Sequence, residues 1–464
     1  MPIRITAPAI ALVLFVAAGL AGFFFKSEAA TGDPNVVKVV SSMPRSGSSR
    51  GQTDTIRNGL MLAFHEIGNR IELVDPETGA KTSYRLEYLD LDDATAAAGQ
   101  WTIEQEIANA NQARNDPDVM AYVGTYNSGA AKVSMPILNR ANLLMVSPAN
   151  TAEQLTMKSS DAERNEPECY RPSGVLNYVR VVPTDGLQSL LTVEFLSRPV
   201  GGSSPGLGAK QIYILDDNEL YGKGLSDSVA KHCKSAKYDI KVLGQESIDP
   251  KAQTYETLMT KIKALAPDAI YFGGTTQSNA GQLLKDMKKS GLKCPLVGPD
   301  GTCENAIISA AGEDTFDDVP FYATFPGLTT DGLLKLGGRG KTYVEGYSEL
   351  YAEDVLVDGV FKRRPKPPTE AYAVYGYDCG VVLIEAFKKA GKKDRNAIRE
   401  AVFKVEKFEG ATGSFRFDPA TGDTTNQFMT VNRVQKVQQI DPDTKASKTV
   451  SQFVLAARLE LPRE

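Results

Sequence analysis

Residues 119–151 constrain the fold of this chain more than any other segment. An apolar run over 119–123 meets Gly124 and a polar turn, a helix of small residues is predicted to start at Ser128, and a second apolar run covers 143–146. This order is typical of a β-turn-α-β unit. Because the first backbone N–H groups of a helix have no partner within the helix, the start at Ser128 suits an anion such as a carboxylate.

The same alternation of strands and helices continues on both sides of this unit. It predicts an α/β fold with open parallel sheets that are covered by helices on both faces. A polar stretch at 158–172 interrupts the rhythm and a second series follows, so two sheet systems are expected. A basic, Pro-rich run at 362–368 is expected to be a surface loop. The predicted strands include 36–40, 85–91, 211–215, 240–246, 269–272 and 295–297, and the predicted helices include 53–67, 94–115, 188–196, 221–235, 255–265, 279–290 and 369–390.

The composition excludes several classes of function. The chain has 464 residues, of which 42% are hydrophobic, and this is enough for two domains with separate cores. Its net charge is −5 and its basic residues are scattered among the acidic ones, so no nucleic-acid partner is expected. The two histidines, His65 and His232, lie far apart and match no metal-ligand pattern. We therefore expect no metal, no cofactor and no histidine-based catalysis.

The first 30 residues have the character of an export segment. Arg4 precedes an uncharged stretch over 5–25, and small residues follow Lys26 at the spacing that signal peptidase accepts. The stretch is also about long enough to span a bilayer, so residues 1–30 are either a signal peptide or an N-terminal anchor. Both predict an exported protein, in the periplasm or on the outer face of the cytoplasmic membrane. In that compartment a pair of cysteines such as Cys294 and Cys303 could form a disulfide.

The ends of the predicted strands carry the candidate chemistry, because ligands of open parallel sheets bind beyond the carboxyl ends of the strands. These ends offer hydroxyls, amides, an aromatic ring and carboxylates, without a nucleophile and a base in recognisable partnership. Phosphate-binding glycine loops are absent from the sequence. The adjacent pair Asp216 and Asp217 is expected to be solvated. These features indicate recognition of a small molecule, so the chain is not expected to be an enzyme.

Motifs along nearly the whole exported chain carry a resemblance to a known family. They are Val123-Gly-Thr-Tyr-Asn-Ser128, Ser147-Pro-Ala-Asn-Thr151, the run 216–224, Tyr271-Phe-Gly-Gly274, Gly298-Pro-Asp-Gly301 and Gly413-Ser-Phe-Arg-Phe-Asp418. In order and spacing the chain resembles the solute-binding proteins of branched-chain amino acid (Leu/Ile/Val-type) ABC transporters. The resemblance implies a type I periplasmic-binding-protein fold, in which two Rossmann-like α/β lobes are joined by three crossovers.

The resemblance also implies where the lobes divide. The crossovers would fall near Pro183, Phe325 and Thr412. Lobe 1 would then comprise 31–183 and 325–412, and lobe 2 would comprise 184–324 and 413–464.

Carried onto this sequence, the resemblance implies a role for five residues. Ser128 and Thr151 would bind the ligand α-carboxylate, and the backbone carbonyl of Asn150 would suit an ammonium group. Asp300 would pair with the ligand amino group, and Tyr221 would cover the ligand from the second lobe. The alternatives are an N-cap role for Ser128, a turn role for Asp300 and helix-start packing for Tyr221.

Two departures from the family leave the side chain of the ligand open. Arg50 and a Thr-Thr-Gln run that includes Thr276 stand where leucine-selective relatives place aromatic side chains. An arginine that faces the cleft would favour a second carboxylate or another polar group on the ligand, whereas an arginine on a flexible loop would be solvated. The expected ligand is an amino acid or a related small carboxylate, either aliphatic or polar.

These inferences predict an extracytoplasmic solute-binding protein. It would capture its ligand when two hinged lobes close, and it would deliver the ligand to the membrane permease of an ABC transporter. The alternative is a membrane-anchored ligand sensor of the same fold, with the uncleaved first segment as its anchor.

Overall fold

The computed structural model describes residues 32–158, 162–201, 205–357, 359–441 and 445–460. The predicted signal peptide or anchor, residues 1–30, lies outside the described residues. Within the described ranges, no helix is both long enough and apolar enough to span a membrane. The strands of the described chain form a six-stranded sheet, a seven-stranded sheet and two hairpins.

The six-stranded sheet has the strand order β2-β3-β1-β4-β5-β6. Its neighbouring strands are parallel, except that β2 is antiparallel to β3. Every residue of β4 is buried, as expected for a central strand that is covered on both faces. The strands are β1 (Val36–Met43), β2 (Arg70–Val74), β3 (Lys81–Asp92), β4 (Val119–Gly124), β5 (Leu144–Ser147) and β6 (Tyr178–Arg180).

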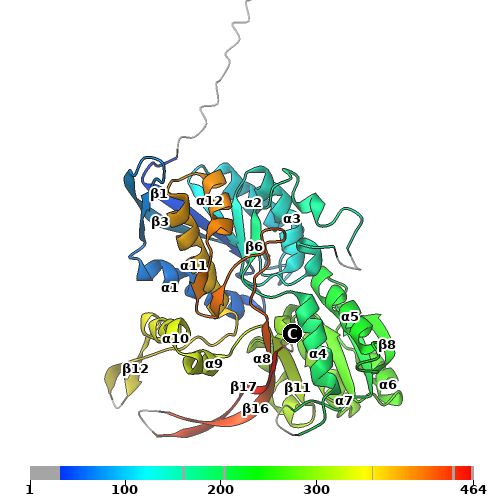
Figure 1. Ribbon diagram of the computed structural model, residues 1–464. Coiled ribbons are helices and arrows are strands. Elements are labelled where there is room, and N and C mark those ends of the chain that lie inside the picture. The colour runs from blue at the N-terminus through cyan, green and yellow to red at the C-terminus, as the bar shows by residue number, and fades with distance from the viewer. Residues whose placement is uncertain (1–31, 159–161, 202–204, 358, 442–444, 461–464) are drawn as a thin grey trace, which may run out of the picture. The chain divides into compact units, whose positions relative to one another are not determined.

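Helices cover both faces of this sheet (Figure 1). Val40 and Tyr122 belong to the apolar cluster with α2 and α3, whereas their neighbours Val39 and Val123 belong to the cluster with α1 and α11. Successive residues of each strand thus face opposite helical layers, as the pleat of a strand requires. The helices are α1 (Arg50–Glu66), α2 (Ile103–Asn115), α3 (Ser128–Arg140), α11 (Ala373–Ala390) and α12 (Arg395–Ala401).

The seven-stranded sheet has the strand order β17-β16-β11-β10-β9-β7-β8. Five neighbouring strands of this sheet, β11, β10, β9, β7 and β8, are parallel to one another. The long strands β16 and β17 extend the sheet as an antiparallel edge. The strands are β7 (Gln211–Asp216), β8 (Lys241–Ser247), β9 (Ala269–Gly273), β10 (Leu296–Gly298), β11 (Phe321–Phe325), β16 (Phe428–Ile440) and β17 (Ser447–Glu460).

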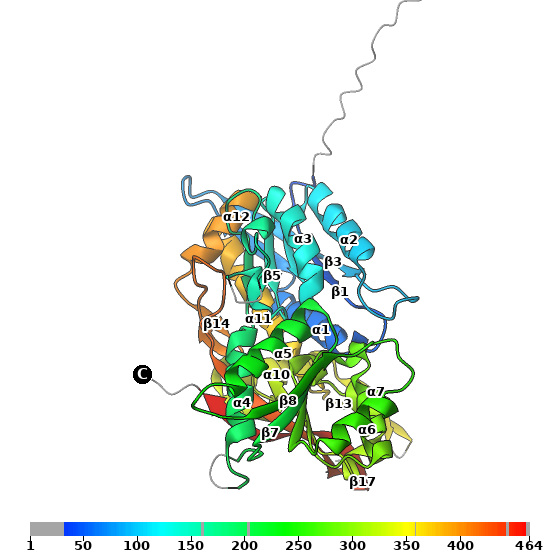
Figure 2. The same ribbon diagram turned by 90° about the vertical axis from the view of Figure 1, so that its right-hand side faces the viewer.

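The helices of the second sheet also form two layers. Ile212 and Ile214 face α4 and α5, whereas Tyr213 and Leu215 belong to the cluster with α6 and α7. Figure 2 shows the two helix pairs on opposite sides of β7 and β8. The helices are α4 (Asp185–Ser197), α5 (Leu220–Cys233), α6 (Glu256–Ala264), α7 (Ala280–Ser290) and the short α8 (Ala306–Ala311). The predicted α/β architecture with two sheets is present.

The chain passes between the two sheets several times. It leaves the first sheet after β6, forms β7 to β11 of the second, turns to α11, which packs on α1, and returns with β16. Pro183 follows β6, Phe325 is the last residue of β11, and Thr412 lies between β14 (Phe408–Gly410) and β15 (Gly413–Phe415). The division into lobes 31–183 plus 325–412 and 184–324 plus 413–464 stays a prediction.

The basic run that was expected to form a loop is partly a strand. After α9 (Thr330–Leu336) and α10 (Gly338–Leu350), the strands β12 (Glu353–Val357) and β13 (Val360–Arg364) pair as an antiparallel hairpin. Arg364 lies opposite Glu353, and Arg363 lies opposite Asp354. Cross-strand pairs of opposite charge favour this pairing, and the sequence pattern of β13 alone did not reveal it.

Two further expectations are wrong. The helix predicted over 94–115 begins only at Ile103, where the Thr102 hydroxyl accepts a hydrogen bond from the backbone N–H of Gln105, and the residues before it form a loop closed by a bridge between Ala94 and Trp101. All five cysteines are free thiols, so the pair considered above does not form a disulfide.

Candidate functional site

A cavity lies at the carboxyl ends of strands from both sheets. Three of the predicted site residues, Ser128, Tyr221 and Asp300, line it, and Arg50, Asn150, Thr151 and Thr276 do not. Its volume is about 30 Å³. The lining residues are Gln100, Trp101, Tyr126, Asn127, Ser128, Gly129 and Ala149 from the first sheet and its loops, Asp217, Glu219, Tyr221, Thr275, Ser278, Asp300 and Gly301 from the second, and Tyr372 just before α11.

The N-terminus of α3 forms one wall of this cavity. The helix begins at Ser128, and no side chain caps it, because the N-cap residue Asn127 makes no side-chain capping bond. The Ser128 hydroxyl oxygen accepts a 3.4 Å hydrogen bond from the Ala152 N–H, so its own proton remains available to a ligand. Uncapped N–H groups and the positive end of the helix dipole together favour an anion here.

Asn150 holds this wall in place from behind. Its side-chain amide donates to the carbonyl oxygens of Thr125 and Tyr126 at 2.9 and 3.1 Å, and thereby fixes the turn that leads into α3. Its own carbonyl, which was predicted to receive an ammonium group, accepts a 3.1 Å hydrogen bond from Arg180. The neighbouring Ala149, and not Asn150, lines the cavity.

Thr151 also lies behind the cavity wall. It is 1% exposed, and its carbonyl accepts a 2.9 Å hydrogen bond from the N–H of Asp185, the first residue of α4. Burial, followed by the nearby charge of Asp300, raises the pKa of the Asp185 carboxyl well above its usual range. Thr151 thus supports a second buried acid near the site.

Asp300 is held by tyrosines from two parts of the chain. Its two carboxylate oxygens accept hydrogen bonds from the hydroxyls of Tyr221, in the first turn of α5, and of Tyr372, before α11. The Tyr221 hydroxyl accepts a 3.1 Å bond in return from the N–H of Gly301. Burial raises the pKa of Asp300, and the bonds from the two tyrosines and Gln188 oppose that shift. The carboxylate is therefore fixed in direction, and no lysine, arginine or histidine among the described residues forms an ion pair with it.

Trp101 closes the cavity over the start of α3. A Cβ atom on Gly129 would lie 2.7 Å from Cζ2 of the Trp101 ring, so the ring packs directly on the helix backbone and requires glycine there. Trp101 is the single tryptophan of the chain. It therefore provides an aromatic wall and an intrinsic fluorescent reporter for this site.

Asp217 is a second buried carboxylate in the cavity wall. The sequence predicted that Asp216 and Asp217 are solvated, but they are only 1% and 3% exposed. One oxygen of Asp217 accepts from the Ser278 hydroxyl at 2.6 Å and the other accepts from the Glu219 N–H at 3.1 Å. Burial raises the pKa of Asp217 to about 7, since these neutral donors compensate only part of the lost solvation.

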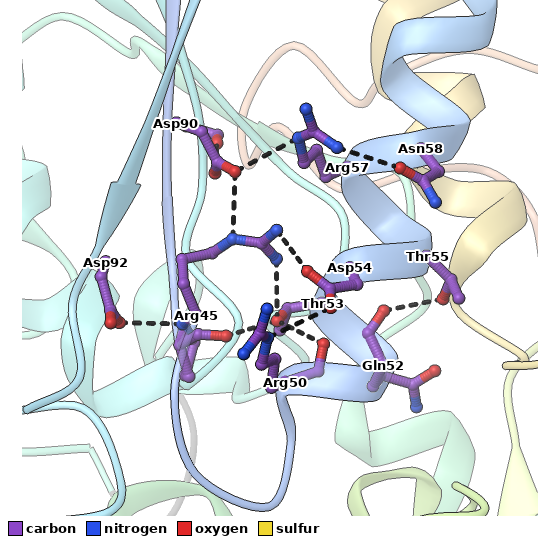
Figure 3. A network of polar contacts seen from close by, with 12 residues as sticks. Arg45, Arg50, Gln52, Thr53, Asp54, Thr55, Arg57, Asn58, Asp90 and Asp92 are labelled. Carbon is purple, nitrogen blue, oxygen red and sulfur yellow. Dashed lines mark hydrogen bonds and ion pairs between the residues drawn. The ribbon is translucent and has the colours of Figure 1, made fainter. Parts of the chain in front are cut away.

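Arg50 points away from the cavity. Its side chain is 65% exposed and forms an ion pair with Asp54 one turn along α1, at 3.4 Å. Figure 3 shows it beside the network of Arg45, which bonds Asp54 at 2.5 Å and Asp90 at 3.1 Å. Thr276 is buried in a short 3₁₀ turn. Neither residue contributes to the cavity lining.

A family model for periplasmic binding proteins matches residues 36–439. The chain belongs to the periplasmic binding protein family. This membership confirms the predicted family, the type I fold with two α/β lobes, and the expectation of a solute-binding protein in place of an enzyme.

Three proteins similar to this periplasmic binding protein each match at least 90% of the chain. The chain is 25% identical over 418 residues to a leucine-, isoleucine-, valine-, threonine- and alanine-binding protein of Pseudomonas aeruginosa. The alignment covers 90% of this chain and 94% of that protein. A crystal structure of a leucine binding protein from Thermotoga maritima is similar with a TM-score of 0.69 at 21% identity, over 92% of this chain and 99% of that one. A solute binding protein of an ABC transporter from R. palustris, in complex with benzoate, has a TM-score of 0.63 at 18% identity, over 92% and 98% of the two chains.

Several residues that line the cavity were missed in the sequence. Trp101 lay in a segment assigned to a helix, and Tyr372 in an apolar run that predicted only a core helix, whereas Asp217 lay at a candidate strand end but was expected to be solvated. The signal that could have found Trp101 was a lone tryptophan among small and polar residues. Tyr372 carried no comparable signal, because its partner Asp300 lies 72 positions earlier.

Proposed function

We propose that this protein is an exported solute-binding protein that captures an α-amino acid or a related small carboxylate between its two lobes and delivers it to the permease of an ABC transporter. The observation that carries the proposal is that one cavity is lined both by the uncapped start of α3 and by the buried carboxylate of Asp300. These two groups match the opposite charges of a zwitterion.

The α-carboxylate of the ligand would bind at the start of α3. There the Ser128 hydroxyl and the free N–H groups of the first turn supply donors, and the helix dipole adds a favourable field. The residues at this helix start, Asn127, Ser128 and Gly129, have uncharged side chains. These three residues therefore do not repel an anion, and the helix dipole attracts it.

The α-ammonium group of the ligand would bind at Asp300. The carboxylate is already oriented by Tyr221 and Tyr372, so little conformational entropy is lost when a cation arrives. Since burial disfavours the ionised carboxylate, an incoming ammonium gains more from the pairing than it would at a solvated site.

The two protein groups proposed to bind the ligand belong to different sheets. This arrangement supports capture of the ligand by closure of the two lobes. Ser128 belongs to the first sheet's helices and Asp300 to the second sheet's loops, so a ligand bridges the two only when they are close together. A ligand that gains contacts only in the closed form shifts the population toward it. The ligands in the names of the relatives, namely amino acids and benzoate, share a carboxylate, and the transporter in those names supports delivery to a permease.

The test is a binding screen on the exported form of the protein. Titration of amino acids, sugars, purines and benzoate, followed by Trp101 fluorescence and by calorimetry, is expected to show binding of α-amino acids. Mass spectrometry of small molecules released from the freshly purified protein gives an independent readout. Binding of sugars or purines with no binding of any carboxylate would refute the proposal.

A further inference from the structure

We propose that the ligand carries a second positive charge on its side chain, so that the site selects a basic amino acid over a neutral one. This inference rests on the proposed function and deepens it. It departs from the expectation that Arg50 would select a ligand with an additional carboxylate, because Arg50 lies outside the cavity.

The charge of the cavity lining is the first reason. Asp217, Glu219 and Asp300 line the cavity, and the described lining residues include no lysine, arginine or histidine. The buried Arg180 is not available, because it pairs with Asp423 at 2.6 Å. A zwitterion with a neutral side chain adds no net charge, whereas a basic amino acid adds one positive charge to a site that contains three carboxylates.

The position of Asp217 relative to Asp300 is the second reason. A Cβ atom on Gly274 would lie 2.9 Å from an oxygen of Asp217, and the Gly274 carbonyl lies 3.2 Å from the Cβ position of Gly301, the residue after Asp300. Gly274 thus lies between Asp217 and Gly301, so Asp217 and the segment that carries Asp300 belong to the same wall of the cavity. One small ligand can therefore place one amino group at Asp300 and another cationic group near Asp217.

The continuation of the cavity is the third reason. Gln100, Asp217 and Glu219 also line a second, more open cavity of about 480 Å³, whose lining includes Asp249 and Lys251 as well. The inner cavity is small by comparison, so a long side chain that starts from the inner cavity passes Asp217 and Glu219 as it extends outward. An acidic passage of this kind suits the length and charge of a basic side chain.

Unused polar and aromatic groups fit the same ligand. Tyr126 lines the inner cavity and is 6% exposed, and its hydroxyl has no hydrogen-bond partner within the described part of the chain. The side-chain oxygen of Asn127 is likewise an unused buried acceptor among the described residues. The rings of Trp101 and Tyr126 add faces that attract cations. These groups offer acceptors and π surfaces to a ligand that brings donors and positive charge.

The experiment compares cationic amino acids with neutral isosteres. Arginine is matched with citrulline and ornithine with norleucine, and the dissociation constants are measured by calorimetry and by Trp101 fluorescence. We expect the cationic member of each pair to bind about 10- to 100-fold more tightly, the ratio that a hydrogen bond to a charged group typically provides. Equal binding within both pairs, or tighter binding of the neutral members, would overturn the inference.

Variants of the acidic passage give a second readout. Glu219→Gln and Asp217→Asn keep the size of each side chain and remove its charge, so each is expected to weaken arginine binding more than citrulline binding and thus to reduce the ratio of arginine affinity to citrulline affinity. Glu406→Gln, on an exposed loop outside both cavities, is the matched control and is expected to keep the ratio. An unchanged ratio in both passage variants would overturn the inference.

A third ligand distinguishes this inference from the proposed function. Agmatine has the guanidinium group of arginine but no carboxylate. If agmatine binds as tightly as arginine, the carboxylate site at α3 and therefore the proposed function fail, whereas binding of neutral amino acids alone would refute only the second charge.

Discussion

Replacing Asp300 by asparagine tests the proposed ammonium site directly. The substitution preserves the size of the side chain and leaves one oxygen to accept from Tyr221 or Tyr372. What it removes is the negative charge at a position that is only 2% exposed. Amino acid binding should weaken, because the ligand ammonium would then be buried without a counter-charge.

The structure sets the expected size of this effect. Removing one side of a buried charge pair in an interface costs about 2–5 kcal/mol, and the retained hydrogen-bond acceptor places Asp300→Asn near the lower end of that range. A loss of about 2–3 kcal/mol corresponds to about a 30- to 150-fold higher dissociation constant. Tyr372→Phe removes one of the two hydroxyl donors and leaves the charge, so its expected effect is smaller, about tenfold.

The stability of the ligand-free variant separates a lost binding group from a damaged fold. Because burial raises the pKa of Asp300 in the folded protein, its charge opposes folding above the pKa of the unfolded chain, and stability decreases as pH rises through that window. At neutral pH Asp300→Asn should therefore unfold in urea at the same or a higher concentration than the parent. Calorimetry at pH 7 gives the affinity. Parental affinity in a folded Asp300→Asn variant would refute the assignment.

Three further perturbations have defined outcomes. Arg180→Met should lower the free energy of unfolding by about 3–5 kcal/mol, because it leaves the Asp423 carboxylate without its buried partner; a urea midpoint equal to that of the parent would contradict this. Gly129→Ala should displace the ring of Trp101, with a shift of its fluorescence maximum and weaker ligand binding, and an unchanged spectrum would refute the close contact. Burial and the charge of Glu370 raise the pKa of Glu304 in the folded protein to about 8. The free energy of unfolding of the parent should therefore decrease between pH 5 and pH 8, and the contribution of Glu304 to this decrease is up to about 1.4 kcal/mol per pH unit. Glu304→Gln should lose less over the same interval, as measured by urea unfolding at both pH values.

The alternation of apolar runs and helical patterns was enough to predict the architecture. The strand β4, the turn after Gly124 and the start of α3 at Ser128 lie where the sequence placed them. The reason is that strand and helix periodicity, and the glycines and polar residues that interrupt it, are local properties of neighbouring residues. The errors arose where partners are distant, as in the hairpin of β12 and β13, whose opposite charges become visible only when the strands are paired.

The candidate site could be predicted only in part. The motifs around Ser128, Tyr221 and Asp300 placed three residues in the cavity, because each motif ends a strand and the carboxyl ends of parallel strands gather at one edge of a sheet. Side-chain direction was beyond the sequence. Arg50 was offered as a ligand group, yet its side chain turns outward to Asp54.

The amino-acid sequence by itself determined the two sheets, their helical layers and the strand ends at which a ligand site had to lie, since these follow from short-range periodicity. Tertiary structure alone decided that Trp101 packs on Gly129, that Tyr372 donates to Asp300, and that Asp217 is buried in the wall of the cavity. Tyr372 and Asp300, for example, are 72 positions apart in the sequence. They depend on how two independently formed sheets pack, and no local pattern records that packing.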